Sequence, residues 1–97
     1  MFAVILEIFP VENVQMTNRM TGQPENLNKM GFRLCTPDGE IYAEAFGNVV
    51  SQIMSQPLQV GDLVYALVIH SVRKYNRNDG RQGVSNEVKL MNIYRVK

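Results

Sequence analysis

The residues best suited to chemistry lie near the C-terminal end of the sequence, where basic side chains cluster around an aromatic one. An apolar, β-branched run ends in Arg73-Lys74-Tyr75, and the polar turn that follows it contains Arg77 and Arg81. Cationic side chains pair with phosphate groups, and a neighbouring aromatic ring offers a face on which bases stack. This combination favours contact with a phosphate chain and its bases.

Basic charge is unevenly distributed along the chain. Residues 73–97 contain seven Lys or Arg and two acidic residues, a net charge of +5, whereas residues 1–72 contain three and seven, a net charge of −4. The two values add to the net charge of +1 of the whole chain. The C-terminal segment therefore provides an electrostatic footprint for a polyanion. The alternative is a hairpin whose charges are only solvated.

A second pair of aromatic residues, Tyr42 and Phe46, lies on one side of a strand expected over residues 40–46. Small aliphatic residues occupy the alternate positions of that strand and are typical of a core-facing side. The aromatic pair is therefore expected to face away from the core. Exposed aromatics of this kind either stack on bases or are covered by a neighbouring subunit.

The sequence lacks the residue sets that catalysis and metal binding need. It has no Ser/His/Asp or Cys/His pairing, no phosphate-cradling glycine loop and no pair of carboxylates at a convincing spacing. Cys35 is the single cysteine and His70 the single histidine, which excludes an internal disulfide and argues against a metal site. We expect a protein that is not an enzyme, uses no cofactor and resides in a reducing compartment such as the cytoplasm.

Length and composition predict a single domain over residues 1–97. The apolar share of 45% is that of a globular chain rather than a disordered one. Residues 2–9 lack the basic flank and cleavage site of a signal peptide and are too few to span a bilayer, so they are expected to form the first strand. The chain ends at Lys97 in a basic segment, so no acidic tail for recruiting partners is expected.

Apolar and β-branched runs predict five strands and one short helix. The strands are expected at residues 2–9, 30–36, 40–46, 63–72 and 84–96, and the helix at 49–56 with Asn48 as its N-cap. Residues 17–29 are rich in Asn, Gly, Pro and Thr without a period, and we expect a long loop there. Residues 62–96 are expected to form the basic hairpin.

This order of elements predicts an all-β fold. A short helix between strands three and four of an antiparallel, partly closed barrel is the arrangement of the five-stranded Greek-key barrel called the OB-fold. In the second strand, the alternation predicts that Phe32 and Leu34 face the core and that Arg33 faces outward. The first strand is apolar on both faces, which fits burial on two sides or a contact with another subunit.

Several short segments between residues 40 and 90 form a set. They are Tyr42 to Asn48, Pro57 to Asp62, Leu63 to Tyr65, Val72 to Tyr75, Asp79-Gly80 and Asn86 to Val88. As a set they resemble the OB-fold domain of single-stranded DNA-binding proteins of the bacterial, organellar and phage type.

The resemblance implies roles for particular residues. Tyr75 and Phe46 would stack on bases, each stacked base contributing roughly 1–3 kcal/mol. Phosphates would be contacted by Arg73, Lys74, Arg77, Arg81 and Arg33. The resemblance also implies a homodimer or homotetramer.

The sequence departs from that family in several places. It has no tryptophan, and Ile8 and Val68 occupy positions where the family usually has glycines. The turn between the second and third strands is cut to three residues, 37–39. These departures leave open a phage, plasmid or accessory member, an isolated domain, or a related OB-fold protein of the primosomal type.

The favoured function is binding of single-stranded DNA without sequence specificity, in replication, recombination or repair. Stacking and phosphate contacts serve RNA equally well, so the residues do not separate the two. The alternative is a protein–protein interaction module in which Tyr42, Phe46 and Tyr75 form an interface. Charge is usually depleted at the centre of such interfaces, so the cations around Tyr75 favour nucleic acid.

Overall fold

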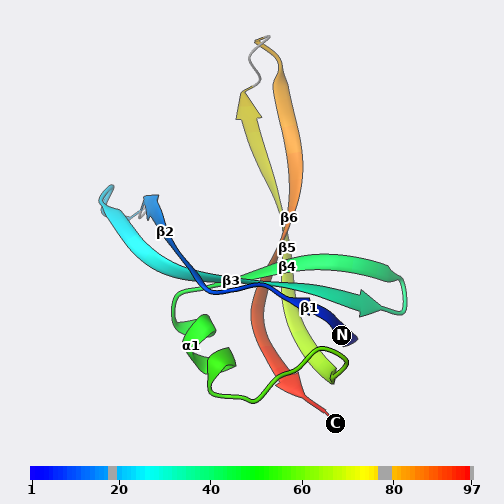
Figure 1. Cartoon of the computed structure of the whole chain (residues 1–97). Helices are drawn as coiled ribbons and strands as arrows, with labels where there is room; N and C mark the ends of the chain where they lie inside the picture. The colour runs from blue at the N-terminus through cyan, green and yellow to red at the C-terminus, as the bar shows by residue number, and fades with distance from the viewer. Residues whose placement is uncertain (18–19, 77–79, 97) are drawn as a thin grey trace.

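The computed structural model describes residues 1–17, 20–76 and 80–96, with the side chains of residues 73–76 excepted. Figure 1 shows a barrel with two β-hairpin arms that extend beyond it. The elements are β1 (Phe2–Ile8), β2 (Glu12–Thr17), β3 (Pro24–Thr36), β4 (Gly39–Phe46), α1 (Asn48–Met54), β5 (Leu63–Asn76) and β6 (Gln82–Arg95).

The strands close into a barrel because β1 has two partners. The sheet order is β1-β5-β6-β4-β3-β2, and β1 also pairs with β3. All pairings are antiparallel except that of β4 with β6, which is parallel. Five of these strands, β1, β5, β6, β4 and β3, form the closed barrel, and β2 pairs only with β3. This barrel, with a helix between β4 and β5, confirms the predicted OB-fold.

The core lies inside the barrel and follows the two-residue alternation of the strands. Phe32 and Leu34 are fully buried, as predicted, and so are Ala43 and Ala45 of β4. The remaining buried apolar residues are Ala3, Ile5, Val50, Ile53, Val64, Ala66, Leu90 and Ile93. No polar or charged residue of the described chain is buried in this core.

The helix α1 covers one end of the barrel through Val50 and Ile53. The prediction that Asn48 is its N-cap is wrong, because Asn48 is already the first helical residue and Gly47 is the N-cap. Gly47 has a φ of 62°, a conformation that glycine adopts without steric cost, and it turns the chain from β4 into the helix. Met54, the last residue of the helix, is 60% exposed. Over the residues that the structure describes, no helix has the length and apolarity needed to cross a bilayer.

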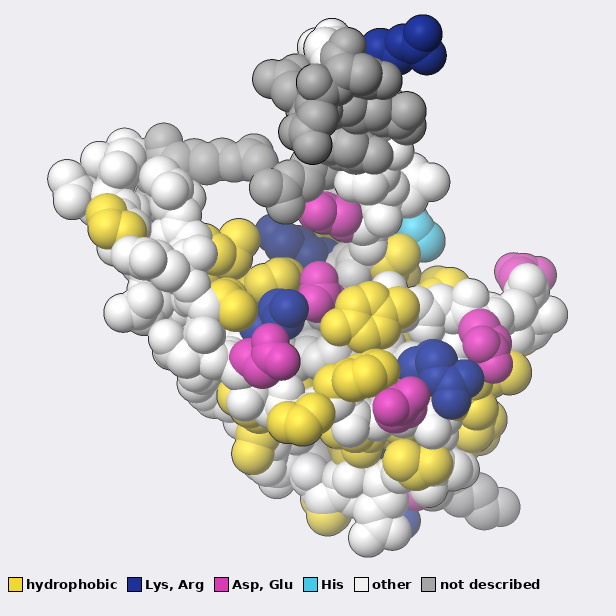
Figure 2. Space-filling model, turned by 45° about the horizontal axis from the view of Figure 1, so that its top comes forward, with side chains coloured by type: hydrophobic (Ala, Val, Ile, Leu, Met, Phe, Trp, Pro, Cys, Tyr) yellow, Lys and Arg dark blue, Asp and Glu magenta, His cyan; other side chains and the backbone are white. Residues whose placement is uncertain are grey.

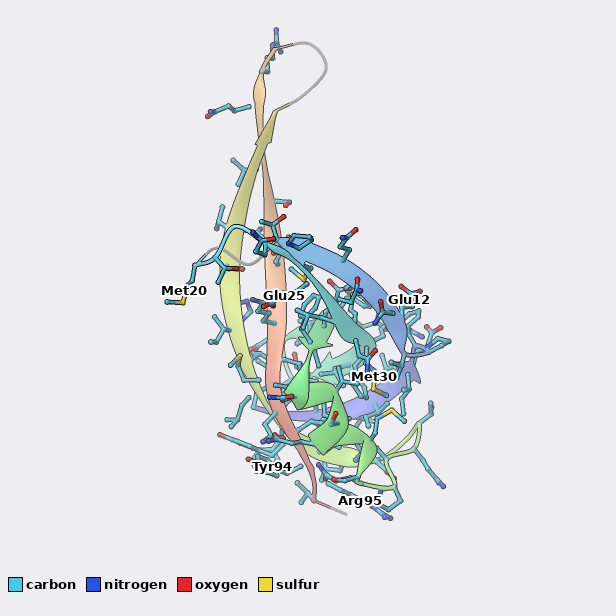
Figure 3. All side chains as sticks on the ribbon, turned by 90° about the vertical axis from the view of Figure 1, so that its left-hand side faces the viewer. Glu12, Met20, Glu25, Met30, Tyr94 and Arg95 are labelled. Carbon is cyan, nitrogen blue, oxygen red and sulfur yellow. The ribbon has the colours of Figure 1, made fainter. Side chains whose placement is uncertain are left out.

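The prediction of a long loop over residues 17–29 is wrong for residues 24–29, which belong to β3. They pair with β2 in continuous register from Glu12↔Lys29 to Thr17↔Pro24. The local composition disfavours a strand, but backbone pairing with β2 provides the hydrogen bonds that propensity alone does not predict. β2 and the first half of β3 form the first of the two arms, and Figure 3 shows Met20 at its turn.

The second arm is the hairpin of β5 and β6, which pair from Val64↔Arg95 to Asn76↔Gln82 with one register shift near Leu67. β5 pairs with β1 only at its start and β6 pairs with β4 at Lys89, and the part of the hairpin beyond these pairings extends past the barrel. The radius of gyration is 15.0 Å, whereas a compact chain of this length has about 12.5 Å. The two arms account for the difference.

One side chain supports the end of β6 that lies farthest from the hairpin turn. The Gln56 amide donates to the backbone oxygen of Ile93 at 2.7 Å and accepts from the backbone nitrogen of Arg95 at 3.4 Å. We expect Gln56→Ala to lower the free energy of unfolding by about 1–2 kcal/mol, since two hydrogen bonds are lost. Chemical denaturation measures this change. Gln52→Ala, an exposed residue of the same helix, is the control and should change stability by less than about 0.5 kcal/mol. Equal stability of the two variants would contradict this role of Gln56.

Candidate nucleic-acid interface

A cleft of about 1190 Å³ lies between the two arms and above the outer face of β4. Figure 2 shows apolar, basic and acidic side chains interleaved on the surface between the arms. The cleft is lined from β2 by Val14 to Thr17, from β3 and β4 by Lys29, Glu44 and Phe46, and from β5 and β6 by Ile69, Ser71, Val72, Glu87, Val88, Lys89 and Met91. Its floor is therefore the predicted outward face of the third strand.

Phe46 is the aromatic residue that lines the floor of the cleft. It is partly buried and pairs in register with Lys29 of β3. The ammonium group of Lys89 lies 5.8 Å from the centre of its ring. This distance is within cation–π range. The ring and the ammonium together provide a stacking surface and a cation at the same point.

Glu44 lies in the middle of the floor and holds two neighbours. Its Oε2 atom is 3.1 Å from the ammonium of Lys29 and accepts a hydrogen bond from the Tyr42 hydroxyl at 3.2 Å. Glu12 lies on the other side of the lysine, with Oε2 3.7 Å from Nζ. The hydrogen bond and charge of Glu44 raise the pKa of Lys29 above its usual value.

Tyr42 lies beside the cleft, outside its lining, with its ring laid over the backbone of Gly31. A Cβ atom built on Gly31 would lie 2.9 Å from the Cε2 atom of this ring, so only glycine leaves room for it. Phe9 packs against the ring edge-on with centroids 5.5 Å apart. Burial first, and then the charge of Glu44, raise the pKa of the Tyr42 phenol. Its side chain is held by its neighbours but remains 47% exposed.

Arg33 faces outward, as predicted, but it is engaged by acidic residues. Its guanidinium contacts Oε1 of Glu7 and Oε1 of Glu40, each at 3.2 Å. It is not part of the cleft lining. A phosphate would have to compete with two carboxylates for this arginine, so the structure places it at the edge of the candidate interface.

The other predicted contact residues lie on the second arm. The backbones of Arg73, Lys74 and Tyr75 belong to β5, in register with Ser85, Val84 and Gly83. Their side chains, and the whole of Arg77, lie outside the described part of the chain.

Arg81 is exposed immediately before β6. Arg81 therefore belongs to the arm that forms one wall of the cleft.

The sequence patterns did not predict Lys89 and Glu44 as site residues, although both line the cleft. Lys89 reaches the ring of Phe46 because β6 runs parallel to β4 with Lys89 opposite Glu44. That pairing joins residues 45 positions apart, and no local pattern reveals it. The position of Glu44 could have been predicted from the local sequence, since it lies between Tyr42 and Phe46 on the same outward face of one strand.

A second apolar surface covers the outside of β1, β5 and β6. Phe2, Tyr65 and Tyr94 form a row across these strands, with exposures of 56%, 39% and 48%. The rings of Phe2 and Tyr65 meet edge-on at 5.0 Å. Leu67 continues the surface along β5 and is 42% exposed. Ile69, two residues further along, is 50% exposed and lines the cleft. Figure 3 shows Tyr94 at the end of β6 away from the hairpin turn.

Comparison with solved structures identifies the same barrel in another protein. The fold is similar to that of Rim1, the mitochondrial single-stranded DNA-binding protein of S. cerevisiae, with a TM-score of 0.56 and 15% sequence identity. The match covers 100% of this chain and 91% of that chain. The likeness establishes the OB-fold. No protein-family model matches the sequence, and the search of curated proteins finds no match.

The contact between Gly31 and Tyr42 can be tested directly. We expect Gly31→Ala to displace the Tyr42 ring, break its contact with Phe9 and lower the free energy of unfolding by about 1 kcal/mol. The pKa of Tyr42 should fall toward its usual value, because the displaced ring is solvated. An NMR pH titration of the tyrosine ring signals measures this shift.

A double-mutant cycle provides the control for this prediction. In a Tyr42→Ala background no ring remains to be displaced, so Gly31→Ala should cost little. The same loss of stability in both backgrounds would show that Gly31 is required for another reason.

Proposed function

We propose that this chain binds single-stranded DNA, without sequence specificity in the first instance, in the cleft between its two arms. The observation that supports this most is Phe46 on the cleft floor with the ammonium of Lys89 at 5.8 Å. A base can stack on the ring while a phosphate of the same strand pairs with the lysine. Stacking accepts every base because each has a π-face.

We assign the contacts with bases and those with phosphates to different parts of the cleft. Among the described residues that line the cleft, Lys29 and Lys89 are balanced by the acidic Glu44 and Glu87. The excess of basic residues belongs to the hairpin sequence: Arg73, Lys74, Arg77 and Arg81. We therefore assign base stacking to Phe46, with Tyr42 beside it and Tyr75 on the arm. Phosphate pairing is assigned to Lys89 and the cations of the hairpin, with Arg33 a weaker contributor because it is already paired with Glu7 and Glu40.

The similarity to a mitochondrial single-stranded DNA-binding protein supports this proposal through the shared fold. OB-folds host several functions, so it is the residues of the cleft that favour single-stranded DNA here. We propose replication, recombination or repair in the cytoplasm as the setting, and RNA is the competitor to test beside DNA.

We further propose that two or more copies of the chain associate through the outer face of β1, β5 and β6. Its large exposed apolar residues include Phe2, Tyr65 and Tyr94. A patch of this kind marks an interaction site. These three aromatic residues lie outside the cleft lining, so association through them would leave the cleft open for DNA.

Binding is tested by fluorescence anisotropy of a labelled oligothymidine of roughly 30 nucleotides, long enough for two or more OB sites. We expect tight binding that weakens as salt rises, because phosphate pairing releases counterions. A duplex of equal length should bind much more weakly. Phe46→Ala and Tyr75→Ala should each weaken binding by roughly 1–3 kcal/mol.

Met54→Ala is the control for these variants, because Met54 is 60% exposed on α1 and outside the cleft lining. It should bind as the unaltered protein does. Unchanged affinity of a folded Phe46→Ala, Tyr75→Ala double variant would contradict the assigned site. Absence of binding even at low salt would instead favour the protein-interaction module.

Association is tested by analytical ultracentrifugation of Tyr65→Glu. A carboxylate in the middle of the apolar face should be costly to bury, so this variant should sediment as a monomer. Met54→Glu introduces the same charge on α1 and should keep the oligomeric state. A monomeric parent protein at high concentration would contradict the proposed association.

A further inference from the structure

The floor of the cleft has a carboxylate at its centre, which is unexpected for a surface that binds a polyanion. Glu44 lines the cleft, and its side chain is 30% exposed. Along β4 it lies two residues from Tyr42 and two from Phe46, on the same outward face. A base stacked on either ring would bring its edge toward Glu44, because alternate residues of a strand lie about 7 Å apart.

The position of this carboxylate is fixed by two contacts. Lys29 Nζ lies 3.1 Å from Oε2, and the Tyr42 hydroxyl donates to the same oxygen at 3.2 Å. A carboxylate can accept at both of its oxygens and at about four lone-pair positions. Glu44 is thus held in place while keeping the capacity to accept from a ligand.

A fixed carboxylate in a nucleic-acid cleft repels phosphates but can accept from bases. Cytosine and adenine each present an exocyclic amino group, a donor that pairs with the carboxylates of Glu and Asp. Uracil and thymine present a carbonyl oxygen in the place of the cytosine amino group. When the base lies where a cytosine amino group would donate to Glu44, that oxygen faces the carboxylate instead, and the ring N3–H of uracil or thymine could donate only if the base lay in a different position.

We propose that Glu44 is a specificity-determining residue that accepts a hydrogen bond from the amino group of a bound base. Strands rich in cytosine or adenine then bind more tightly than strands rich in thymine or uracil. This inference rests on the proposed single-strand binding and adds a base preference to it. The preference is superimposed on stacking, which accepts every base.

The sharpest comparison is between labelled oligodeoxycytidine and oligodeoxyuridine of equal length, because neither base has a methyl group. Binding is measured by anisotropy at slightly alkaline pH, where cytosine is neutral. The parent protein should bind the cytidine strand roughly three- to tenfold more tightly. In Glu44→Gln the ratio should fall to about one, since an amide both donates and accepts.

Glu12→Gln is the matched control. Glu12 contacts the same lysine, with Oε2 3.7 Å from Nζ, but is not part of the cleft lining. Both variants remove one negative charge near Lys29, so both should bind the uridine strand more tightly than the parent protein. Only Glu44→Gln should change the ratio between the two strands.

The outcomes separate this inference from the proposed function. A ratio near one in the parent protein, or an equal ratio in the parent and in Glu44→Gln, overturns the role of Glu44 and leaves single-strand binding standing. Failure of the parent protein to bind either strand overturns both. Circular dichroism of the two variants verifies that each remains folded.

Discussion

The barrel depends on one strand, β1, that pairs along both of its edges. The backbone of Ile5 donates to the oxygen of Asp62 at 3.0 Å and accepts from the nitrogen of Gly61 at 2.8 Å, while its other side is in register with Leu34 of β3. Pairing on both edges removes the open edges that a flat sheet would leave. Closure also separates the two faces of every strand. One face fills the core, and the other is available for contacts with partners.

The candidate interface follows from this separation. Because Ala43 and Ala45 face the core, Glu44 and Phe46 must face outward on the same strand. The parallel pairing of β4 with β6 brings Lys89 to them. Two arms continue past the barrel on either side of this open face, and together they enclose a cleft. The charged residues described in its lining balance one another, whereas the sequence of the second arm is basic. We therefore expect bases and phosphates to contact different parts of one surface.

The sequence pattern within each segment correctly predicted which residues of a strand face the core and in which order the strands and the helix follow one another. The alternation of β4 and of the second half of β3 correctly assigned Phe32, Leu34 and the aromatics to their faces. The order of strands and helix was sufficient to identify the OB-fold, although the sequence identity to Rim1 is 15%. The largest error concerns a feature that depends on distant residues. Residues 24–29 form a strand because β2 pairs with them.

The same reason explains what the sequence did not show about the site. Lys89 reaches Phe46 through a parallel pairing between distant segments, and Arg33 is paired with Glu7 of another strand as well as with Glu40. Charge counting treats each arginine and lysine as equally available. In the structure, availability depends on which carboxylates the fold places beside each cation.

The central claim is that the cleft, and not the outer apolar face, receives single-stranded DNA. NMR of the isotope-labelled protein titrated with a short unlabelled oligonucleotide tests it most directly. We expect the largest shifts at Phe46, Lys89 and neighbouring residues of the cleft, with little change at Phe2 and Tyr94. Shifts concentrated on the outer face of β1, β5 and β6, with the cleft unaffected, would contradict the account.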